Sequence, residues 1–268
     1  MTEPRSYTGP GPFRIDQLRE EDRYELSDGH PIYCAPGGRD HADGSSTGSL
    51  VLKTDPAVEW SGFDAGYRTD GGTLRAPDIA VGPPPERDGW IPGAPPLAVE
   101  YASRGQDEAE LEARIADLLA AGTRLVWVVR LVGPRRVEVH AREQAVRVYG
   151  TDDILLAPGI LQNPVPVRAL YNRDVACDEA LRNLLQRRGF TSLEAVQAES
   201  EARGEAQAVL KLLEIRGLRV TEAQRQTILD CRDIEQIGIW LQRAISADSA
   251  DSLFQCIDGK MTLINLST

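Results

Sequence analysis

Apolar residues follow two different patterns along this chain. In the first two thirds, short apolar runs lie between stretches rich in proline and glycine, which is typical of strands. The runs at residues 73–81 and 97–101 predict two buried strands, and those at residues 124–131, 136–141 and 145–149 predict three more. The last third instead shows apolar residues at helical spacing, and it contains no strand-like run.

One helix stands out in the first part of the chain, at residues 106–121. Leu111, Ile115 and Leu118 fall at positions i, i+4 and i+7, so they share one helix face. Gly122 lies where such a helix is expected to end. The pattern therefore predicts an amphipathic helix between two strands.

The N-terminal part gives weaker predictions. Residues 13–22 predict a short amphipathic helix, and residues 24–26 lead into the turn Ser27-Asp28-Gly29, which predicts a hairpin. Residues 35–49 are rich in Gly, Ser and Asp and predict a loop. Residues 82–96 contain six prolines and predict a rigid, irregular connection.

The change of pattern places a domain boundary near residues 172–178. We therefore expect a first domain at residues 13–174 and a helical C-terminal region at residues 175–255. Residues 1–12 are expected to form a disordered lead-in, and residues 256–268 a short tail.

Charge and length narrow the classes of function. The 268 residues carry a formal net charge of −11, which argues against a generic nucleic-acid coat protein, because such proteins bind through an excess of Lys and Arg. An enzyme with a local basic groove is not excluded. No apolar run approaches the ~18 residues that a membrane helix needs. Because the N-terminus also lacks the apolar segment of a secretory signal, we expect a cytoplasmic protein without a membrane partner.

Cysteine and histidine do not indicate a zinc site. The four cysteines are widely separated, and their spacing to the three histidines matches no zinc-binding pattern, so we expect reduced structural thiols. His41 lies in the predicted loop at residues 35–49, where an exposed side chain is expected. The alternative for His41 is a base or a substrate contact.

Two carboxylates stand where apolar side chains are expected. Asp78 precedes the apolar run Ile79-Ala80-Val81, and Glu100 closes the run Leu97-Ala98-Val99. Because side chains alternate along a strand, Glu100 shares its face with small residues and has space beside it. A buried carboxylate is costly unless it is paired or bound to a cation. If the two strands are neighbours, both carboxylates can bind one hard divalent cation, Mg²⁺ or Mn²⁺.

A cation is expected at the same place. Arg114 follows Leu111 by three residues and precedes Leu118 by four, so it lies on the helix face that packs against the sheet. A metal there would polarise a phosphoryl oxygen, and Arg114 would stabilise the charge that develops during phosphodiester hydrolysis. The alternative is structural: Asp78 caps a turn, and Glu100 forms a buried ion pair with Arg114 that has no catalytic role.

The order of these motifs resembles the PD-(D/E)XK nuclease superfamily and, more narrowly, its Uma-type family of restriction endonucleases. The resemblance covers roughly residues 13–171. It implies an α/β (α+β) fold with a restriction-endonuclease-like mixed sheet core flanked by helices, followed here by a small helical C-terminal region. The matching features are residues 24–29 (YELSDG), His41, residues 76–81 (APDIAV), 95–103 (PPLAVEYAS), 126–129 (VWVV) and 157–171.

The resemblance also implies roles for single residues. Asp78 and Glu100 would be the metal-binding acids, and Glu25 would be the acid from the first structural unit that closes the metal site. The family's lysine tends to lie on the helix, where this chain has Arg114. Gln106, at the start of the helix, would orient a water or a phosphate.

Two departures from the family pattern bear on activity. Glu100 is followed by Tyr101-Ala102, so there is no E-x-K lysine, and the helical lysine has become Arg114. Arginine can bind phosphate through two nitrogens, but it cannot lose its proton to activate a water. The resemblance as a whole still implies a Mg²⁺- or Mn²⁺-dependent endonuclease that hydrolyses DNA, and this is the function that we expect. The alternative is a catalytically weakened nuclease scaffold that binds nucleic acid or a protein.

Partners follow from the same resemblance. Nucleic acid is the expected substrate. A homodimer would suit the cutting of both strands, and the helical C-terminal region would suit either dimerisation or a protein partner. A purely stabilising role for this region is the alternative.

Overall fold

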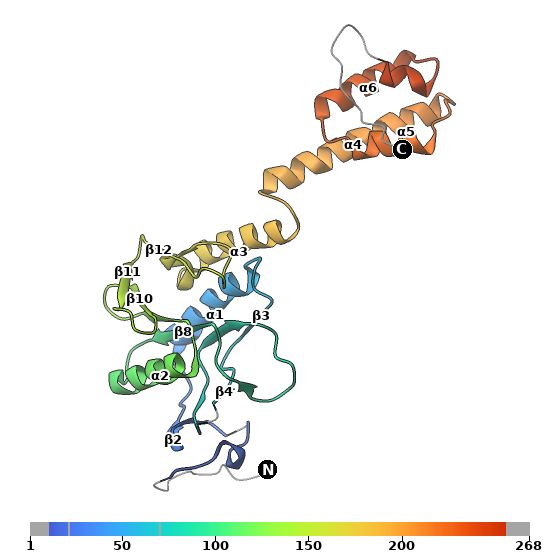
Figure 1. The fold of residues 1–268 in the computed structure, drawn as a ribbon. Coiled ribbons are helices and arrows are strands. Elements are labelled where there is room, and N and C mark those ends of the chain that lie inside the picture. Colours follow the sequence, from blue (N-terminus) through green and yellow to red (C-terminus); the bar gives the residue numbers. More distant parts are fainter. Residues whose placement is uncertain (1–10, 21, 70, 256–268) are drawn as a thin grey trace. The chain divides into compact units, whose positions relative to one another are not determined.

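The computed structural model describes residues 11–20, 22–69 and 71–255, which form two compact units that divide after Gly189. The first unit contains all the described strands together with helices α1 to α3, and the second contains helices α4 to α6 (Figure 1). The predicted tail at residues 256–268, and all but two residues of the predicted lead-in, lie outside the described residues.

A six-stranded sheet forms the centre of the first unit. Its strand order is β11-β10-β9-β8-β6-β3, in which β8 and β9 run parallel and the other neighbours antiparallel. The four predicted runs from residue 97 to residue 149 are confirmed as strands of this sheet. The strands are β3 (Trp60–Gly62), β6 (Ile79–Gly82), β8 (Leu97–Ala102), β9 (Leu125–Arg130), β10 (Arg136–His140) and β11 (Arg147–Gly150).

A smaller, five-stranded sheet carries the predicted hairpin. Its order is β2-β1-β5-β4-β7, and Asp28 and Gly29 take left-handed φ angles of 48° and 78° at the turn between β1 and β2. A separate two-stranded sheet pairs β12 with β13. These strands are β1 (Tyr24–Ser27), β2 (His30–Tyr33), β4 (Tyr67–Arg68), β5 (Leu74–Arg75), β7 (Ile91–Pro92), β12 (Ile154–Leu155) and β13 (Val165–Pro166).

The single strand predicted at residues 73–81 is in fact two strands. β5 belongs to the smaller sheet and β6 to the larger one. Pro77 lies between them, and because proline has no backbone N–H it does not continue a hydrogen-bonded ladder. The break leaves Asp78 at the head of β6, where the chain passes from one sheet to the other.

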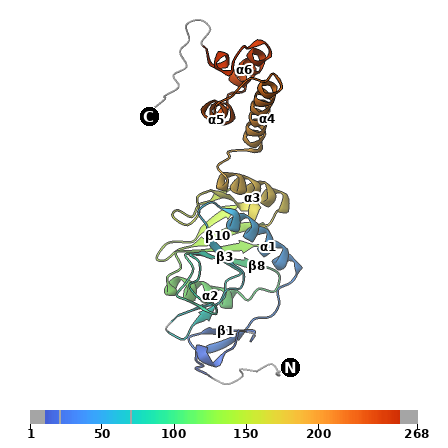
Figure 2. The ribbon, with the colours of Figure 1, turned by 90° about the vertical axis from the view of Figure 1, so that its right-hand side faces the viewer.

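Helices cover both faces of the central sheet (Figure 2). α2 (Glu108–Ala121) packs on one face and ends at Gly122, whose φ is 112°, as predicted. α1 (Arg39–Thr54), α3 (Arg173–Arg187) and the short 3₁₀ helix η2 (Val167–Leu170) lie on the other face. The alternation predicted along β8 is confirmed: Leu97, Val99 and Tyr101 face the α1 side, and Ala98 and Ala102 face α2.

The loop predicted at residues 35–49 is wrong over most of its length, because α1 begins at Arg39. Gly44 and Gly48 lie one helical turn apart and face Tyr101 of β8. A Cβ added at Gly48 would lie 2.0 Å from the Tyr101 hydroxyl oxygen, so only glycine permits this close approach. Helix propensity disfavours this sequence, and packing on the sheet outweighs that preference.

The helix predicted at residues 13–22 is also wrong. Among the described residues of this stretch, only Ile15–Gln17 form a 3₁₀ turn, η1. Phe13 and Ile15 pack with Leu18 in a small cluster beside the hairpin, but their spacing of two residues does not place them on one α-helical face. An isolated helix of this length is marginal in any case.

The C-terminal region is helical, as predicted. It consists of α4 (Leu193–Ile215), α5 (Glu222–Asp230), α6 (Ile234–Ser246) and the 3₁₀ helix η3 (Ala250–Phe254). Its own core packs α4 against α5 and α6, with Trp240 in edge contact with Phe254.

The first compact unit extends beyond the boundary predicted at residue 174, because α3 belongs to it. Asn183 donates a hydrogen bond to the carbonyl oxygen of Val51 at 3.1 Å, and Arg187 donates to the carbonyl oxygens of Thr54 and Asp55. α3 therefore docks on α1 through polar side chains. Polar contacts of this kind leave no apolar periodicity in the sequence, so the sequence pattern did not indicate them.

Candidate active site

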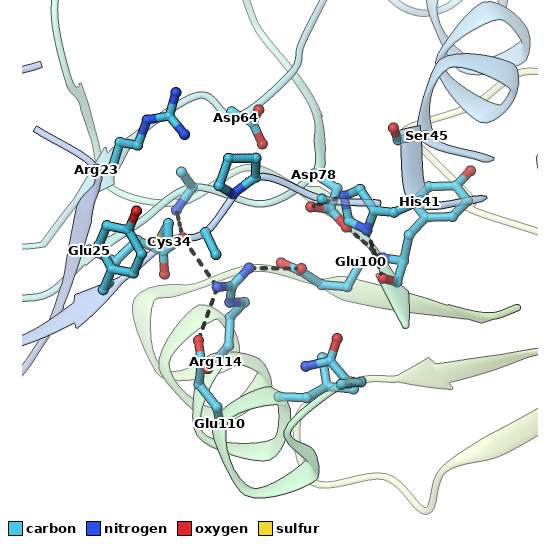
Figure 3. A pocket seen from close by; sticks show the side chains of 18 of the residues that line it. Arg23, Glu25, Cys34, His41, Ser45, Asp64, Asp78, Glu100, Glu110 and Arg114 are labelled. Carbon is cyan, nitrogen blue, oxygen red and sulfur yellow. Dashed lines mark hydrogen bonds and ion pairs between the residues drawn. The ribbon is translucent and has the colours of Figure 1, made fainter. Parts of the chain in front are cut away.

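A cavity of about 810 Å³ lies beside β1, β2, the start of α1 and the N-terminal half of α2. All five residues singled out from the sequence line this one cavity: Glu25, Asp78, Glu100, Gln106 and Arg114. Glu25 lies on β1, Asp78 at the head of β6, Glu100 on β8 and Arg114 on α2. Figure 3 shows these four side chains around a common space.

Asp78 and Glu100 are brought together by the pairing of β6 with β8. The two strands are antiparallel with Ile79 opposite Val99, which places Asp78 beside Glu100. One Asp78 oxygen, Oδ2, accepts a hydrogen bond from the backbone N–H of Tyr101 at 2.6 Å. Both carboxylates are buried, with exposed fractions of 8% for Asp78 and 3% for Glu100.

Arg114 connects the acids of this cavity, as Figure 3 shows. Its Nη1 lies 3.1 Å from Oε2 of Glu100, and its Nη2 lies 3.4 Å from Glu25 Oε1 and 3.3 Å from Glu110 Oε1. Burial lowers the pKa of Arg114, but the charges of Glu100, Glu25 and Asp78 outweigh it, and the pKa is raised. Arg114 is therefore a permanent cation in the site.

Glu100 has one oxygen without a partner. Oε2 is bound by Arg114, whereas Oε1 is buried and has no hydrogen-bond partner among the described residues. Burial, followed by the nearby charge of Asp78, raises the pKa of Glu100 well above its usual value. A buried carboxylate oxygen in this condition favours a bound proton or cation.

Glu25 has no such free oxygen. Its Oε2 accepts from Arg75 Nη1 at 2.9 Å, and its Oε1 accepts from the backbone N–H of Ala76 at 3.3 Å and faces Arg114. Within residues 11–20, 22–69 and 71–255, no three acidic, histidine or cysteine side chains are grouped closely enough to hold a metal ion. Both oxygens of Glu25 thus have partners in the chain, whereas Glu100 keeps one buried oxygen without a partner among the described residues.

His41 lies on α1 and not in an exposed loop, so that expectation is wrong. Its Nδ1 lies 3.1 Å from the carbonyl oxygen of Tyr101, and its Nε2 lies 3.3 Å from Oδ1 of Asp78. The hydrogen bond to Asp78 is the main reason why the pKa of His41 is raised. His41 therefore orients the Asp78 carboxylate from the side opposite Arg114.

Gln106 lies at the cavity edge and precedes α2. The helix itself begins at Glu108, with Asp107 as its N-cap, whose side chain accepts from the backbone N–H of Ala109 and Glu110. The Gln106 amide donates to the carbonyl oxygen of Asp107 at 3.1 Å. Its side chain is exposed and lines the cavity, which suits contact with a substrate.

Asp64 and Arg75 belong to the site although the sequence analysis did not single them out. Asp64 follows β3 with a left-handed φ of 45°, lines the cavity and points toward the space between the labelled side chains in Figure 3. Burial and the charge of Asp78 raise the pKa of Asp64. Arg75 is buried and joins Glu25 to Asp117 of α2. A charged residue inside a predicted strand was the feature that could have identified Arg75.

Cys34 lines the same cavity, and we expect its thiol to be unreactive. Burial raises the pKa of its thiol to about 12, so the thiol stays protonated at pH 8. We expect iodoacetamide at pH 8 to label the exposed Cys177 and to leave Cys34 unmodified, as measured by peptide mass mapping. Labelling in urea should modify both. Equal labelling rates in the folded protein would contradict the half-buried, protonated state of Cys34.

Comparison with known proteins identifies the family. Residues 13–167 match the model of the Uma2 family, which is described as "Putative restriction endonuclease". This segment is more than half of the chain and contains all the cavity residues described above. The chain belongs to the Uma2 family. The family predicted from the sequence is thus confirmed, and it is a nuclease family, which indicates a nucleic-acid substrate.

A solved structure shows the same fold. A "putative nuclease belonging to DUF820" from Anabaena variabilis superposes with a TM-score of 0.50 at 20% sequence identity. The match covers 60% of this Uma2 chain and 96% of that chain. The predicted α+β restriction-endonuclease-like fold is confirmed. No curated protein matches the chain. Within the described residues, no helix is both long and apolar enough to cross a membrane.

Proposed function

We propose that this Uma2 chain is a nuclease that depends on Mg²⁺ or Mn²⁺ and hydrolyses phosphodiester bonds in DNA, with the metal held by Asp78 and Glu100. The observation that carries the proposal is the buried Oε1 of Glu100, which has no partner among the described residues and lies beside a second carboxylate. Carboxylate oxygens are the ligands that both ions prefer. When bound, the metal supplies a water of lowered pKa and a Lewis acid for the phosphoryl oxygen.

Arg114 and His41 have different roles in this proposal. Arg114 keeps its proton and lies next to Glu100, so it stabilises the negative charge that develops on the phosphoryl oxygens. His41 holds the Asp78 carboxylate through Oδ1, and the backbone N–H of Tyr101 holds Oδ2. These two contacts fix the orientation of Asp78 before substrate binds.

Cleavage of supercoiled plasmid tests the function. We expect the purified chain to nick supercoiled plasmid in Mn²⁺ or Mg²⁺, at places where supercoiling opens the duplex, and to leave it intact in EDTA. Short DNA and RNA strands, single and paired, are included in the same assay. The proposal fails if none of these substrates is cut in any of the metals while the protein is folded.

In the proposed reaction, cleavage depends on the positive charge of Arg114 and not on the shape of its guanidinium group. Arg114→Lys keeps a cation within reach of Glu100, so we expect cleavage within about tenfold of wild type. Arg114→Met removes the cation, and we expect a loss of at least about 100-fold, which corresponds to about 2.7 kcal/mol. Single-turnover cleavage rates measure both. Equal rates for the two variants would show that the charge does not act in the reaction.

Asp64 is the proposed proton acceptor, because Arg114 cannot take up a proton. Its carboxylate faces the cavity, and its raised pKa brings it closer to the range of a useful base. We expect Asp64→Asn to lower the cleavage rate by about 10²- to 10⁴-fold while metal binding persists. Glu20→Gln, which removes the charge of an exposed acid of the same cavity wall, is the control. An unchanged rate in Asp64→Asn would exclude this role.

A second candidate, the weakened scaffold, also rests on an observation. Three of the four carboxylate oxygens of Asp78 and Glu100 already have partners in the chain, which are His41, the backbone N–H of Tyr101 and Arg114. Such a site could bind nucleic acid without cutting it.

A further inference from the structure

We propose that the cavity accepts an unpaired strand of nucleic acid, whose bases stack on exposed aromatic side chains of the cavity wall, and that an intact duplex is a poor substrate. This inference rests on the proposed nuclease function of the same site and names the form of its substrate. It depends on three features of the cavity: its aromatic side chains, its size and its charge.

Two aromatic side chains of the cavity wall are exposed. Tyr33 has an exposed fraction of 59% and Phe63 of 51%, and both line the cavity that contains Asp78 and Glu100. The Tyr33 ring packs edge to face against Tyr24, with ring centroids 5.6 Å apart, and this contact fixes its orientation. An exposed aromatic face beside a phosphodiester site is the arrangement that single-strand binding proteins use to stack bases.

Phe63 lies on a loop that is held in place by packing. A Cβ added at Gly66 would lie 2.6 Å from Cδ1 of Trp90, so the indole rests directly on the backbone of this loop. Asp64, the next residue, takes a left-handed backbone conformation. The backbone of the loop that carries Phe63 is therefore pre-organised, and this reduces the entropy lost when a base binds.

The depth of the acids limits the substrate. Asp78 and Glu100 are almost fully buried, so a phosphodiester has to enter the cavity to reach them. A volume of about 810 Å³ falls in the range of about 300–1,000 Å³ that is typical of small-ligand pockets. Such a space suits a short flexible segment of one strand, which can leave its stack. It does not suit a rigid double helix.

The charge of the wall indicates what binds the strand. Acidic side chains outnumber arginines in the wall by eight to three. Phosphates therefore gain little attraction here without divalent cations, and binding has to come largely from the bases. Stacking supplies about 1–3 kcal/mol per base, and it depends weakly on salt because no counterions are released.

Fluorescence anisotropy with labelled DNA tests the proposal. The wild-type chain is titrated in Ca²⁺, which shares the oxygen-ligand preference of Mg²⁺, with one sequence as a single strand and as a duplex. We expect the single strand to bind more tightly and with a shallow salt dependence. Phe63→Leu and Tyr33→Leu, which keep apolar bulk but lose the ring, should each weaken single-strand binding by about 5- to 150-fold. Phe63→Trp should retain binding.

Leu156→Ala, which changes an exposed apolar residue outside the cavity wall, is the matched control and should bind like wild type. Duplex binding equal to that of the single strand, or wild-type binding by both leucine variants, would overturn the proposal. The two proposals fail separately. Cleavage of a single strand at the wild-type rate by Phe63→Leu would leave the nuclease and remove the stacking role. Single-strand binding that depends on the two rings, without cleavage of any substrate, would support the stacking role and exclude the nuclease function.

Discussion

Replacing Asp78 with asparagine should reduce cleavage by at least about 100-fold, because a metal ligand contributes several kcal/mol to transition-state stabilisation. The substitution removes a negative charge but keeps an oxygen that accepts the 2.6 Å hydrogen bond from the Tyr101 N–H. The fold should therefore remain intact, with a free energy of unfolding close to that of wild type. Single-turnover cleavage rates in Mn²⁺, together with urea unfolding, measure the two effects.

Two further variants separate charge from packing at this position. Asp78→Ala removes both the charge and the hydrogen bond, and it should lose stability by about 1–3 kcal/mol as well as activity. Asp152→Asn removes an exposed carboxylate that pairs with Arg168 outside the cavity, and it should match wild type in both measurements. Wild-type cleavage by Asp78→Asn would contradict its role as a metal ligand.

Arg75→Met should lower the free energy of unfolding of the first unit by about 3–5 kcal/mol. The Arg75 guanidinium is 2% exposed and lies 2.9 Å from Glu25 Oε2 and 2.8 Å from Asp117 Oδ2. Methionine keeps the apolar volume but leaves the buried Glu25 carboxylate without its main partner. Because Glu25 also contacts Arg114, we expect activity to fall in the same variant. Urea unfolding measures the change.

Arg168→Met is the matched control for this prediction. Arg168 also pairs with an aspartate, Asp152, but both side chains are exposed, so the loss should stay within about 1 kcal/mol. Equal stability of the Arg75 and Arg168 variants would show that the buried network does not stabilise the fold. A stable but inactive Arg75→Met would instead assign the network to the orientation of Arg114 alone.

The sequence predicted the centre of the fold because that centre is apolar. The runs that form β8 to β11 and the stripe of α2 have clear periods, and Gly122 ends α2 as expected. The same alternation placed Glu100 on the face toward α2, and the helix spacing placed Arg114 opposite it. These positions follow from local geometry alone.

The parts that were predicted wrongly depend on contacts between distant residues. α1 is helical because Gly44 and Gly48 admit Tyr101, which lies more than 50 residues away. α3 joins the first unit through Asn183 and Arg187, and polar contacts of this kind leave no periodic pattern.

Some contacts of the site also depend on residues that are far apart in the sequence, and these were not predicted. His41 reaches Asp78 only because α1 is a helix. Glu25 pairs with Arg75 and Arg114, and its position in the hairpin does not reveal these contacts. Asp64 depends on a left-handed backbone after β3. Sequence resemblance gave the family's acids, and the structure supplies the cations that surround them.

A titration with Mn²⁺ tests most directly whether Asp78 and Glu100 hold a metal. Binding is measured as the decrease in the electron paramagnetic resonance signal of free Mn²⁺. The measurement needs no substrate, so it is independent of which nucleic acid is cut. We predict one Mn²⁺ per wild-type chain and at least about tenfold weaker binding in Asp78→Asn and in Glu100→Gln. Glu25→Gln should bind Mn²⁺ like wild type. Absence of binding in wild type, or equal binding in all the variants, would contradict the account.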